Sequence, residues 1–225
     1  MAKVYLSPSD QESNVYAYDN TNEAVQCGRI AEACRAALER SGVEVKVGHM
    51  ISMAQKCSDS NAFGADLHVP IHTNAFNGKV MGTRMFCYSA GGKGMAACKA
   101  IFARLAPITP GESENIQVNA DYYEVRVPAA PTAYIECEFH DTVEGAKWIG
   151  ENTVLIGETI ARGICDYFGV TFKEPEQPKP VEPEKKDVLY RVQIGAYKIK
   201  ANAEKRQAEA KAAGFTDAFI VTVEQ

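Results

Sequence analysis

The first 170 residues contain short apolar runs in which polar and apolar positions alternate. Val43, Val45 and Val47 show this period of two most plainly. A period of two is typical of a strand, because successive side chains point to opposite faces of a sheet. The pattern predicts strands at residues 3–8, 43–47, 65–72, 83–88 and 131–138.

Between these runs, apolar residues recur every three to four positions, which is the period of an amphipathic helix. The first such segment begins at Thr21 or Asn22, either of which can cap a helix, and ends at Gly42. Further helices are predicted at 51–63 and 95–105, and one or two at 144–168. Residues 9–21 and 107–121 are expected to be polar loops. Strands that alternate with helices predict an α/β fold with a mixed, mostly parallel sheet flanked by helices.

The composition changes sharply after this region. Residues 173–187 carry four prolines, many charges and one hydrophobic residue, a composition typical of an extended linker. Alternation at 189–196 and 218–223, with a helical segment at 201–213 between them, predicts a small β-α-β unit over 188–225. The catalytic part is then expected to span residues 1–172.

Two of the predicted strands end in residues that bind metals or transfer protons. His72 closes the run at 65–74, and Glu136 lies near the end of the run at 128–141. Because α/β folds bring such residues together at the carboxyl edge of the sheet, we predict metal-assisted hydrolysis there. Glu138 shares the strand face of Glu136 and is a second candidate catalytic carboxylate. His68 lies ~13 Å from His72 along an extended strand, so we interpret it as a packed histidine.

Composition and charge exclude several classes of protein. No apolar run approaches the ~20 residues needed to cross a bilayer, so membrane insertion is not expected. A net charge of −5 without a basic cluster argues against a nucleic-acid partner. The seven cysteines are scattered without a Cys-x-x-Cys pair, and we expect them to be reduced and buried. Since no cleavable signal follows Met1, we expect cytoplasmic synthesis and release by a holin or by cell lysis.

Three segments together resemble the zinc-dependent N-acetylmuramoyl-L-alanine amidases of phage endolysins and bacterial autolysins. Ile-His-Thr-Asn-Ala at 71–75 resembles that family's Ile-His-x-Asn-Ala, Thr-Asn-Glu at 21–23 its helix-starting glutamate, and Pro-x-Ala-Tyr-Ile-Glu-x-x-Phe at 131–139 its catalytic strand. The resemblance implies Zn²⁺ as the cofactor and peptidoglycan as the partner. It implies the following roles: His72 and Glu23 as zinc ligands, Glu136 as general base, and Asn74 and Arg126 as substrate-binding residues.

One segment departs from the family. Where its members have Asp-Pro-Gly-His-Gly-Gly, whose histidine is a zinc ligand, this chain has Ser-Pro-Ser-Asp-Gln at 7–11. Direct alignment puts Asp10 in the ligand position, and Gln11 can reach it through a shifted loop. Aspartate is a reasonable zinc ligand and glutamine a weak one. His140 is the other nearby imidazole, and its strand position turns it away from Glu138. The third ligand stays open between Asp10 and Gln11.

The C-terminal segment resembles one half of a SPOR-type peptidoglycan-binding repeat. Leu-Tyr-Arg-Val-Gln-Ile-Gly-Ala-Tyr at 189–197 and Ala-Ala-Gly-Phe at 212–215 carry this likeness. A complete domain of that kind has two β-α-β halves. Since this chain has one, with open strand edges and an alanine-rich helix, we predict a homodimer formed through the C-terminal unit.

The function predicted from these features is hydrolysis of the amide between N-acetylmuramic acid and L-alanine. The altered segment at residues 10–11 keeps one alternative open, a wall-binding protein with a weakened catalytic site. A zinc peptidase that cuts the stem peptide is a second alternative.

Overall fold

The computed structural model describes residues 1–113, 115–175 and 190–223. The chain divides into two compact units, residues 1–176 and 177–225, and each is described by itself. None of the helices in the described ranges is long and apolar enough to cross a bilayer.

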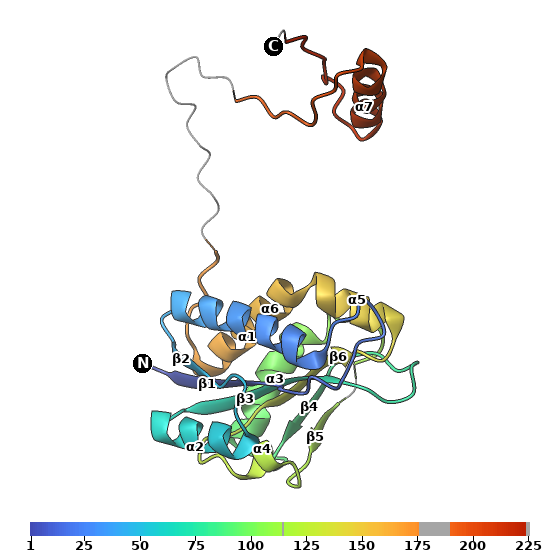
Figure 1. The fold of residues 1–225 in the computed structure, drawn as a ribbon. Helices are drawn as coiled ribbons and strands as arrows, with labels where there is room; N and C mark the ends of the chain where they lie inside the picture. Colours follow the sequence, from blue (N-terminus) through green and yellow to red (C-terminus); the bar gives the residue numbers. More distant parts are fainter. Residues whose placement is uncertain (114, 176–189, 224–225) are drawn as a thin grey trace. The chain divides into compact units, whose positions relative to one another are not determined.

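The larger unit is built on one six-stranded sheet (Figure 1). Its strands lie in the order β2-β1-β3-β6-β4-β5. The β4–β6 pairing is antiparallel and the other pairings are parallel, so β4 and β5 run opposite to the other four strands. This confirms the predicted mixed, mostly parallel sheet. The strand bounds are β1 (Lys3–Pro8), β2 (Glu44–Val47), β3 (Leu67–Asn74), β4 (Arg84–Cys87), β5 (Ile116–Val118) and β6 (Tyr134–Phe139).

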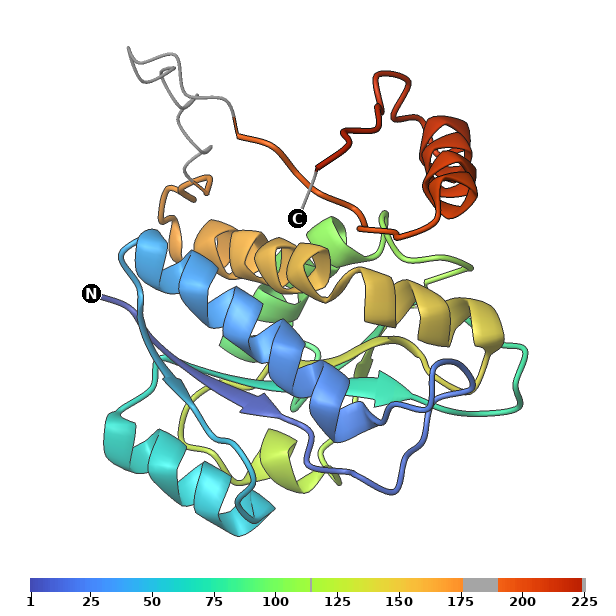
Figure 2. The same cartoon turned by 45° about the horizontal axis from the view of Figure 1, so that its top comes forward.

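Helices cover both faces of this sheet (Figures 1 and 2). One face packs against α1 (Glu23–Arg40), α3 (Lys93–Leu105), α5 (Val143–Glu151) and α6 (Thr153–Phe168). Alternate strand residues such as Leu6, Val69 and Ile135 form a fully buried apolar core with these helices. The other face meets α2 (Met53–Phe63) and the short α4 (Tyr123–Arg126). That face carries the polar side chains of the same strands, and it is where the candidate site lies.

Two short elements differ from the prediction. β5 lies within 107–121, which the sequence predicts to be a loop, and α4 follows directly after it. β5 has three residues and α4 has four, which are too few to show a period, so the pattern of apolar residues predicts neither element. The predicted helical segment at 144–168 is two helices, separated at Asn152.

The larger unit extends beyond residue 172. Arg162 donates two hydrogen bonds of 2.6 Å to the Glu174 carboxylate, and Arg40 Nε donates to the Lys173 carbonyl at 2.8 Å. These contacts hold residues 173 and 174 against α1 and α6, and a linker that starts at residue 173 stays a prediction. The rest of the predicted linker, 176–187, lies outside the described residues.

The C-terminal unit contains the predicted helix as α7 (Lys200–Ala212). In residues 190–196 and 218–223 the structure forms no strand, so the expected β-α-β arrangement is wrong for this part of the chain. The two segments do come together: the Arg191 guanidinium lies 5.6 Å from the Phe219 ring. Alternation favours an extended chain, but a strand also needs a neighbour whose backbone groups complete its hydrogen bonds.

Candidate active site

A histidine and a glutamate meet where β3 ends beside the start of α1. His72 Nδ1 lies 2.9 Å from Glu23 Oε1, and both side chains are buried. Glu23 is held there by the cap of α1, in which Asn22 Oδ1 accepts a 3.0 Å bond from the Val25 amide. Asn14 donates to the other Glu23 oxygen at 2.6 Å. The sequence-predicted pair is therefore brought together and oriented by the backbone on either side.

This pair is electrostatically coupled. Burial alone would raise the pKa of Glu23, but the hydrogen bond and charge of His72 outweigh burial and lower it. Burial opposes protonation of His72, yet its bond to Glu23 and the charges of Glu136 and Glu23 raise its pKa. Each group therefore favours the charged form of the other.

Glu136 lies next to this pair on the neighbouring strand. It is in register with His72 across the β3–β6 pairing. Only 9% of the residue is exposed, and its Oε2 has no hydrogen-bond partner among the described residues. Burial is the main reason that its pKa rises to about 7, with a smaller raising effect from Glu23 and opposing effects from His72 and Arg84. A buried carboxylate with a free oxygen and a pKa near neutrality is suited to proton transfer.

The ring of His72 is fixed by an aromatic neighbour that the sequence did not single out. Tyr134, two residues before Glu136, stacks on His72 with ring centroids 4.8 Å apart. Tyr122 packs against Tyr134 at 5.1 Å. The alternation of β6 contains the signal for this contact, because Tyr134 and Glu136 share one strand face.

The structure separates the two candidates for the third ligand. Gln11 Nε2 lies 3.4 Å from His72 Nδ1, and Asn14 bridges Gln11 and Glu23. Asp10 is turned away: its carboxylate binds Lys56 Nζ at 2.7 Å and accepts from the Met50 amide at 3.0 Å. Gln11 is therefore at the site, whereas the Asp10 carboxylate is engaged elsewhere.

His140 is also engaged elsewhere. Its Nδ1 lies 2.9 Å from Thr73 Oγ1, and its ring stacks on Tyr16. Burial is the main reason that its pKa is lowered, which keeps the ring neutral. His140 packs behind the site rather than joining the His72–Glu23 pair.

The donors that do converge fit a zinc ion. An imidazole nitrogen and a carboxylate are strong zinc ligands, and Gln11 adds an amide oxygen once its side chain is turned over. The orphaned Glu136 oxygen supports this fit, because a buried acceptor without a donor is costly unless something else occupies the space beside it.

Glu138 has a different environment from Glu136. The strand pairing shifts register between His72 and Asn74, and Glu138 accepts bonds of 2.7 Å from the Gly82 and Phe139 amides. These bonds fasten the loop that precedes β4. Burial raises the pKa of Glu138 to about 7 despite them. The structure does not bring Glu138 to the His72–Glu23 pair.

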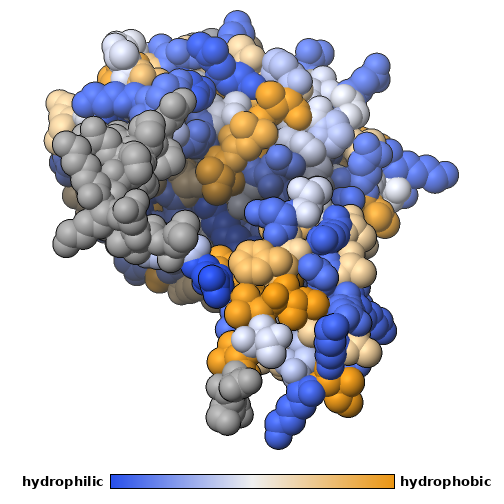
Figure 3. All heavy atoms as spheres, turned by 90° about the horizontal axis from the view of Figure 1, so that it is seen from above, coloured by the Kyte–Doolittle hydropathy of each residue, from blue (hydrophilic) through white to orange (hydrophobic). Residues whose placement is uncertain are grey.

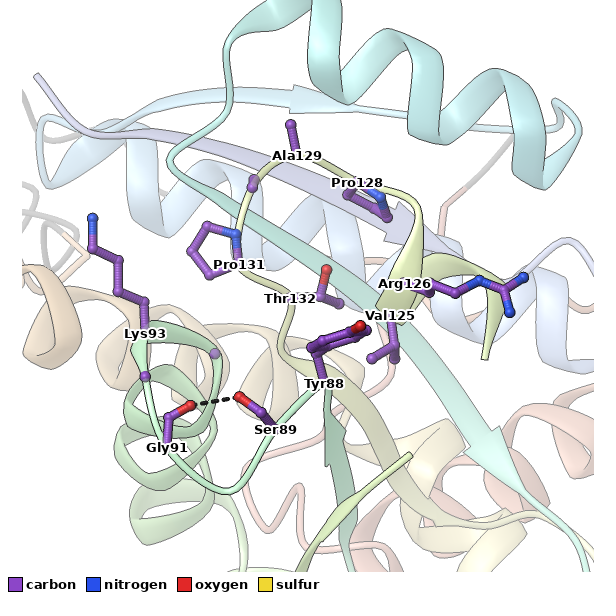
Figure 4. Close-up of a pocket in the computed structure, with 13 residues that line it drawn as sticks. Tyr88, Ser89, Gly91, Lys93, Val125, Arg126, Pro128, Ala129, Pro131 and Thr132 are labelled. Carbon is purple, nitrogen blue, oxygen red and sulfur yellow. Dashed lines mark hydrogen bonds between the residues drawn. The ribbon is translucent and has the colours of Figure 1, made fainter. Parts of the chain in front are cut away.

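The two expected substrate-binding residues lie apart. Asn74 ends β3, half-buried, and its Oδ1 accepts from the Ala75 amide at 2.8 Å. Arg126 is exposed at the end of α4 and lines a groove of about 340 Å³ formed by residues 88–94 and 125–132. In Figure 4 its guanidinium points away from Thr132 at the centre of that groove.

His68 is packed, as predicted. It is fully buried, stacks on Tyr5, and has Nε2 3.2 Å from Glu124 Oε1. Cys57 lies close enough that the three donor atoms are within 4.8 Å of one another. Burial raises the pKa of Cys57 to about 11, which disfavours the thiolate that a metal requires. All seven cysteines are free and buried, which confirms that prediction.

The sheet edge presents a histidine, a glutamate from the first turn of α1 and a buried carboxylate, a set of groups suited to metal-assisted hydrolysis. Residues 9–166 match the family model described as N-acetylmuramoyl-L-alanine amidase, and residues 174–224 match that of the SPOR domain. The chain belongs to the N-acetylmuramoyl-L-alanine amidase family, and it is an enzyme of that kind.

Relatives of known name agree with this assignment. The chain is 26% identical over 228 residues to the sporulation-specific N-acetylmuramoyl-L-alanine amidase of Bacillus subtilis, a match that covers 98% of this chain and 85% of the relative. The amidase CwlM of Bacillus licheniformis is equally similar, with the same coverage.

Solved structures share the fold at lower identity. The catalytic domain of CwlV from Bacillus (Paenibacillus) polymyxa var. colistinus superposes with a TM-score of 0.68 at 16% identity, covering 76% of this chain and all of that one. The catalytic domain of the CD27L endolysin, which targets Clostridia difficile, gives 0.62 at 18% identity, covering 74% and 98%. At these identities the likeness supports the fold.

Proposed function

We propose that the protein cleaves the amide between N-acetylmuramic acid and L-alanine by a zinc-dependent mechanism in which Glu136 is the general base. The observation that carries this proposal is the buried Glu136 carboxylate, whose Oε2 has no hydrogen-bond partner in the described part of the chain and which is in register with a His72 bound to Glu23. His72, Glu23 and Gln11 hold the metal. When bound, zinc supplies Lewis acidity toward the scissile carbonyl and a lowered pKa for a water molecule.

The residues around this site then have distinct roles. Glu136 accepts the proton of the attacking water and returns it to the leaving L-alanine amine. Tyr134 keeps the His72 ring in its plane through the stacking contact. Asn74, at the end of β3, and Arg126, on α4, bind the glycan-peptide on either side of the reacting bond.

Product analysis tests this reaction directly. Digestion of purified peptidoglycan should release new L-alanine amino termini and leave the glycan strands uncut. New amino termini within the stem peptide would show a peptidase instead. Binding to the wall without cleavage, in zinc-loaded protein, would show the wall-binding alternative.

We propose that the C-terminal unit binds peptidoglycan and pairs with a second copy of itself. The SPOR match supports wall binding. Alternate residues Tyr190, Val192 and Ile194 are exposed, as are Phe219, Val221 and Val223 on the second segment. Figure 3 shows hydrophobic side chains at the surface of this unit. Two copies would supply each other with strand partners and a shared apolar core.

Light scattering of the full chain and of residues 1–176 tests the pairing. The full chain should be a dimer at tens of micromolar, and the shortened chain an active monomer with weaker wall binding. A full-length monomer at that concentration would contradict the pairing, and an unfolded shortened chain would contradict the independence of the larger unit. The cut follows residue 176 because Lys173 and Glu174 contact α1 and α6.

A further inference from the structure

A second histidine–glutamate pair lies on the polar face of the sheet, below the catalytic one. Glu124 of α4 is 2% exposed, and its Oε1 accepts a 2.5 Å bond from Ser7 Oγ of β1 and a 3.2 Å bond from His68 Nε2 of β3. One buried carboxylate oxygen thus joins two strands and a helix that are distant in sequence. The bonds and charge of His68 and the bond of Ser7 outweigh burial and keep the pKa of Glu124 low.

The helix that this carboxylate holds has little stability of its own. α4 has four residues and no side-chain cap at its start. A single turn costs more conformational entropy than its few backbone bonds return, so it persists only where side chains anchor it. Val125, which is 4% exposed, and Glu124 are the two buried side chains of α4. Glu124 is therefore its polar anchor.

The start of α4 leads to the active site, and its end carries Arg126. Tyr122, at its start, packs against Tyr134 at 5.1 Å, and Tyr134 stacks on His72 at 4.8 Å. Arg126, at its end, lines the groove of residues 88–94 and 125–132. A shift of α4 would move the support of a zinc-ligand ring and a substrate-binding cation together.

We propose that Glu124 is a positioning residue for the amidase reaction: bound by Ser7 and His68, it fixes α4 so that Tyr122 supports the Tyr134–His72 stack and Arg126 faces substrate. The proposal rests on the function proposed above for His72 and Arg126. Misplacement of binding groups by about 1 Å can cost up to ~10²-fold in rate, so the effect is measurable although Glu124 touches neither metal nor substrate.

The test compares Glu124→Ala with Glu124→Gln in the full chain. The amide keeps an oxygen that can accept from Ser7 and His68, whereas alanine keeps none. Measurements are kcat and KM on a soluble muropeptide and the near-ultraviolet circular dichroism of the tyrosines. Ser7→Ala, which removes one of the two bonds, is a milder variant in case Glu124→Ala does not fold. Ile101→Val in α3 is the control for a general loss of packing.

We expect Glu124→Ala to lower kcat/KM by ~10- to 100-fold, to change the tyrosine signal, and to be rescued to within about threefold by Glu124→Gln. Ser7→Ala should fall between them, and Ile101→Val should leave both readouts unchanged. In a double-mutant cycle, Arg126→Ala should cost much less in the Glu124→Ala background than alone.

Three results would overturn the proposal. These are full kcat/KM in Glu124→Ala, strict additivity with Arg126→Ala, and a glutamine variant as impaired as alanine with a native tyrosine signal. The last would assign the effect to charge rather than position. If Glu136→Gln stays active, the proposed base is wrong. The tyrosine signal and the double-mutant cycle of Glu124→Ala with Arg126→Ala still decide the role of Glu124 in that case.

Discussion

Strand β3 carries two histidine–glutamate pairs four residues apart, and their surroundings differ. His72 and Glu23 lie 2.9 Å apart at the carboxyl end of the strand, whereas His68 and Glu124 lie 3.2 Å apart in its middle. His72 is 8% exposed and adjoins Glu136, whose Oε2 has no partner among the residues that the structure describes, whereas His68 is fully buried beneath α2 and α4. Ser7 donates to Glu124 in the second pair, and Asn14 and Ser9 bind Glu23 in the first.

Both pairs consist of a histidine and a glutamate, so residue type does not decide which pair is reactive and which is structural. Three features distinguish the His72 pair: its position at the edge of the sheet, its slight exposure, and a second carboxylate, Glu136, with a free oxygen. Full burial, and the bonds of Ser7 and His68 to one oxygen of Glu124, make the His68 pair a structural link between β3 and α4.

The largest effect is expected from Glu136→Gln. The amide is nearly the same size but cannot take a proton, so activity on peptidoglycan should fall by ~10²–10⁴-fold while zinc content holds and thermal stability does not fall. Because burial raises the pKa of Glu136 to about 7, wild-type activity should rise with pH through that region as the base loses its proton. A variant that keeps wild-type activity would remove Glu136 from the mechanism.

Histidine substitutions should separate the two pairs. His72→Ala should abolish activity and lower the free energy of unfolding less than His68→Ala does, because His72 is 8% exposed whereas His68 is fully buried. His68→Ala should lower the free energy of unfolding by about 2–4 kcal/mol, since it leaves a cavity and removes a partner of the buried Glu124. Denaturant unfolding and lysis assays on both variants test this, and equal stability losses would show that the pairs do not differ as described.

A smaller, pH-dependent effect is expected from Glu138→Gln. The folded-state pKa of Glu138, about 7, lies above its ordinary value of 4.5 because of burial, so ionisation of this group opposes folding as pH rises between those values. Glutamine avoids that cost and retains an oxygen for the Gly82 and Phe139 amides. The variant should match wild type near pH 4.5 and be more stable by about 1–3 kcal/mol at pH 8. A variant less stable than wild type at pH 8 would contradict this.

The sequence predicts the reactive His72 site better than the structural His68–Glu124 pair. His72 and Glu136 follow apolar runs, and alternation is sufficient to place them at one sheet edge. Glu23 is different, because an acid in a first helical turn is common and only the family resemblance singles it out. Glu124 has no local signal at all, since its helix is four residues long and Ser7 lies 117 positions away.

Long-range contacts explain the other points at which the sequence did not predict the structure. Asp10 and Gln11 are neighbours, and the choice between them depends on Lys56 and Met50, which are distant in sequence. In the C-terminal unit, alternation at 190–196 favours an extended chain, but strand formation depends on a partner that local pattern does not specify. Sequence therefore predicts elements and their faces, and long-range contacts decide which polar groups meet.

The zinc content of the protein tests most directly whether His72 and Glu23 hold the catalytic metal. Protein purified without chelator should contain about one zinc per chain by elemental analysis, and His68→Ala should keep it, whereas His72→Ala and Glu23→Ala should lose it. Gln11→Ala should keep zinc but release it to a competing chelator at lower concentration. Two results would contradict this zinc site. One is wild-type protein that contains no zinc and gains no lytic activity when zinc is added. The other is zinc that is lost in His68→Ala and retained in His72→Ala.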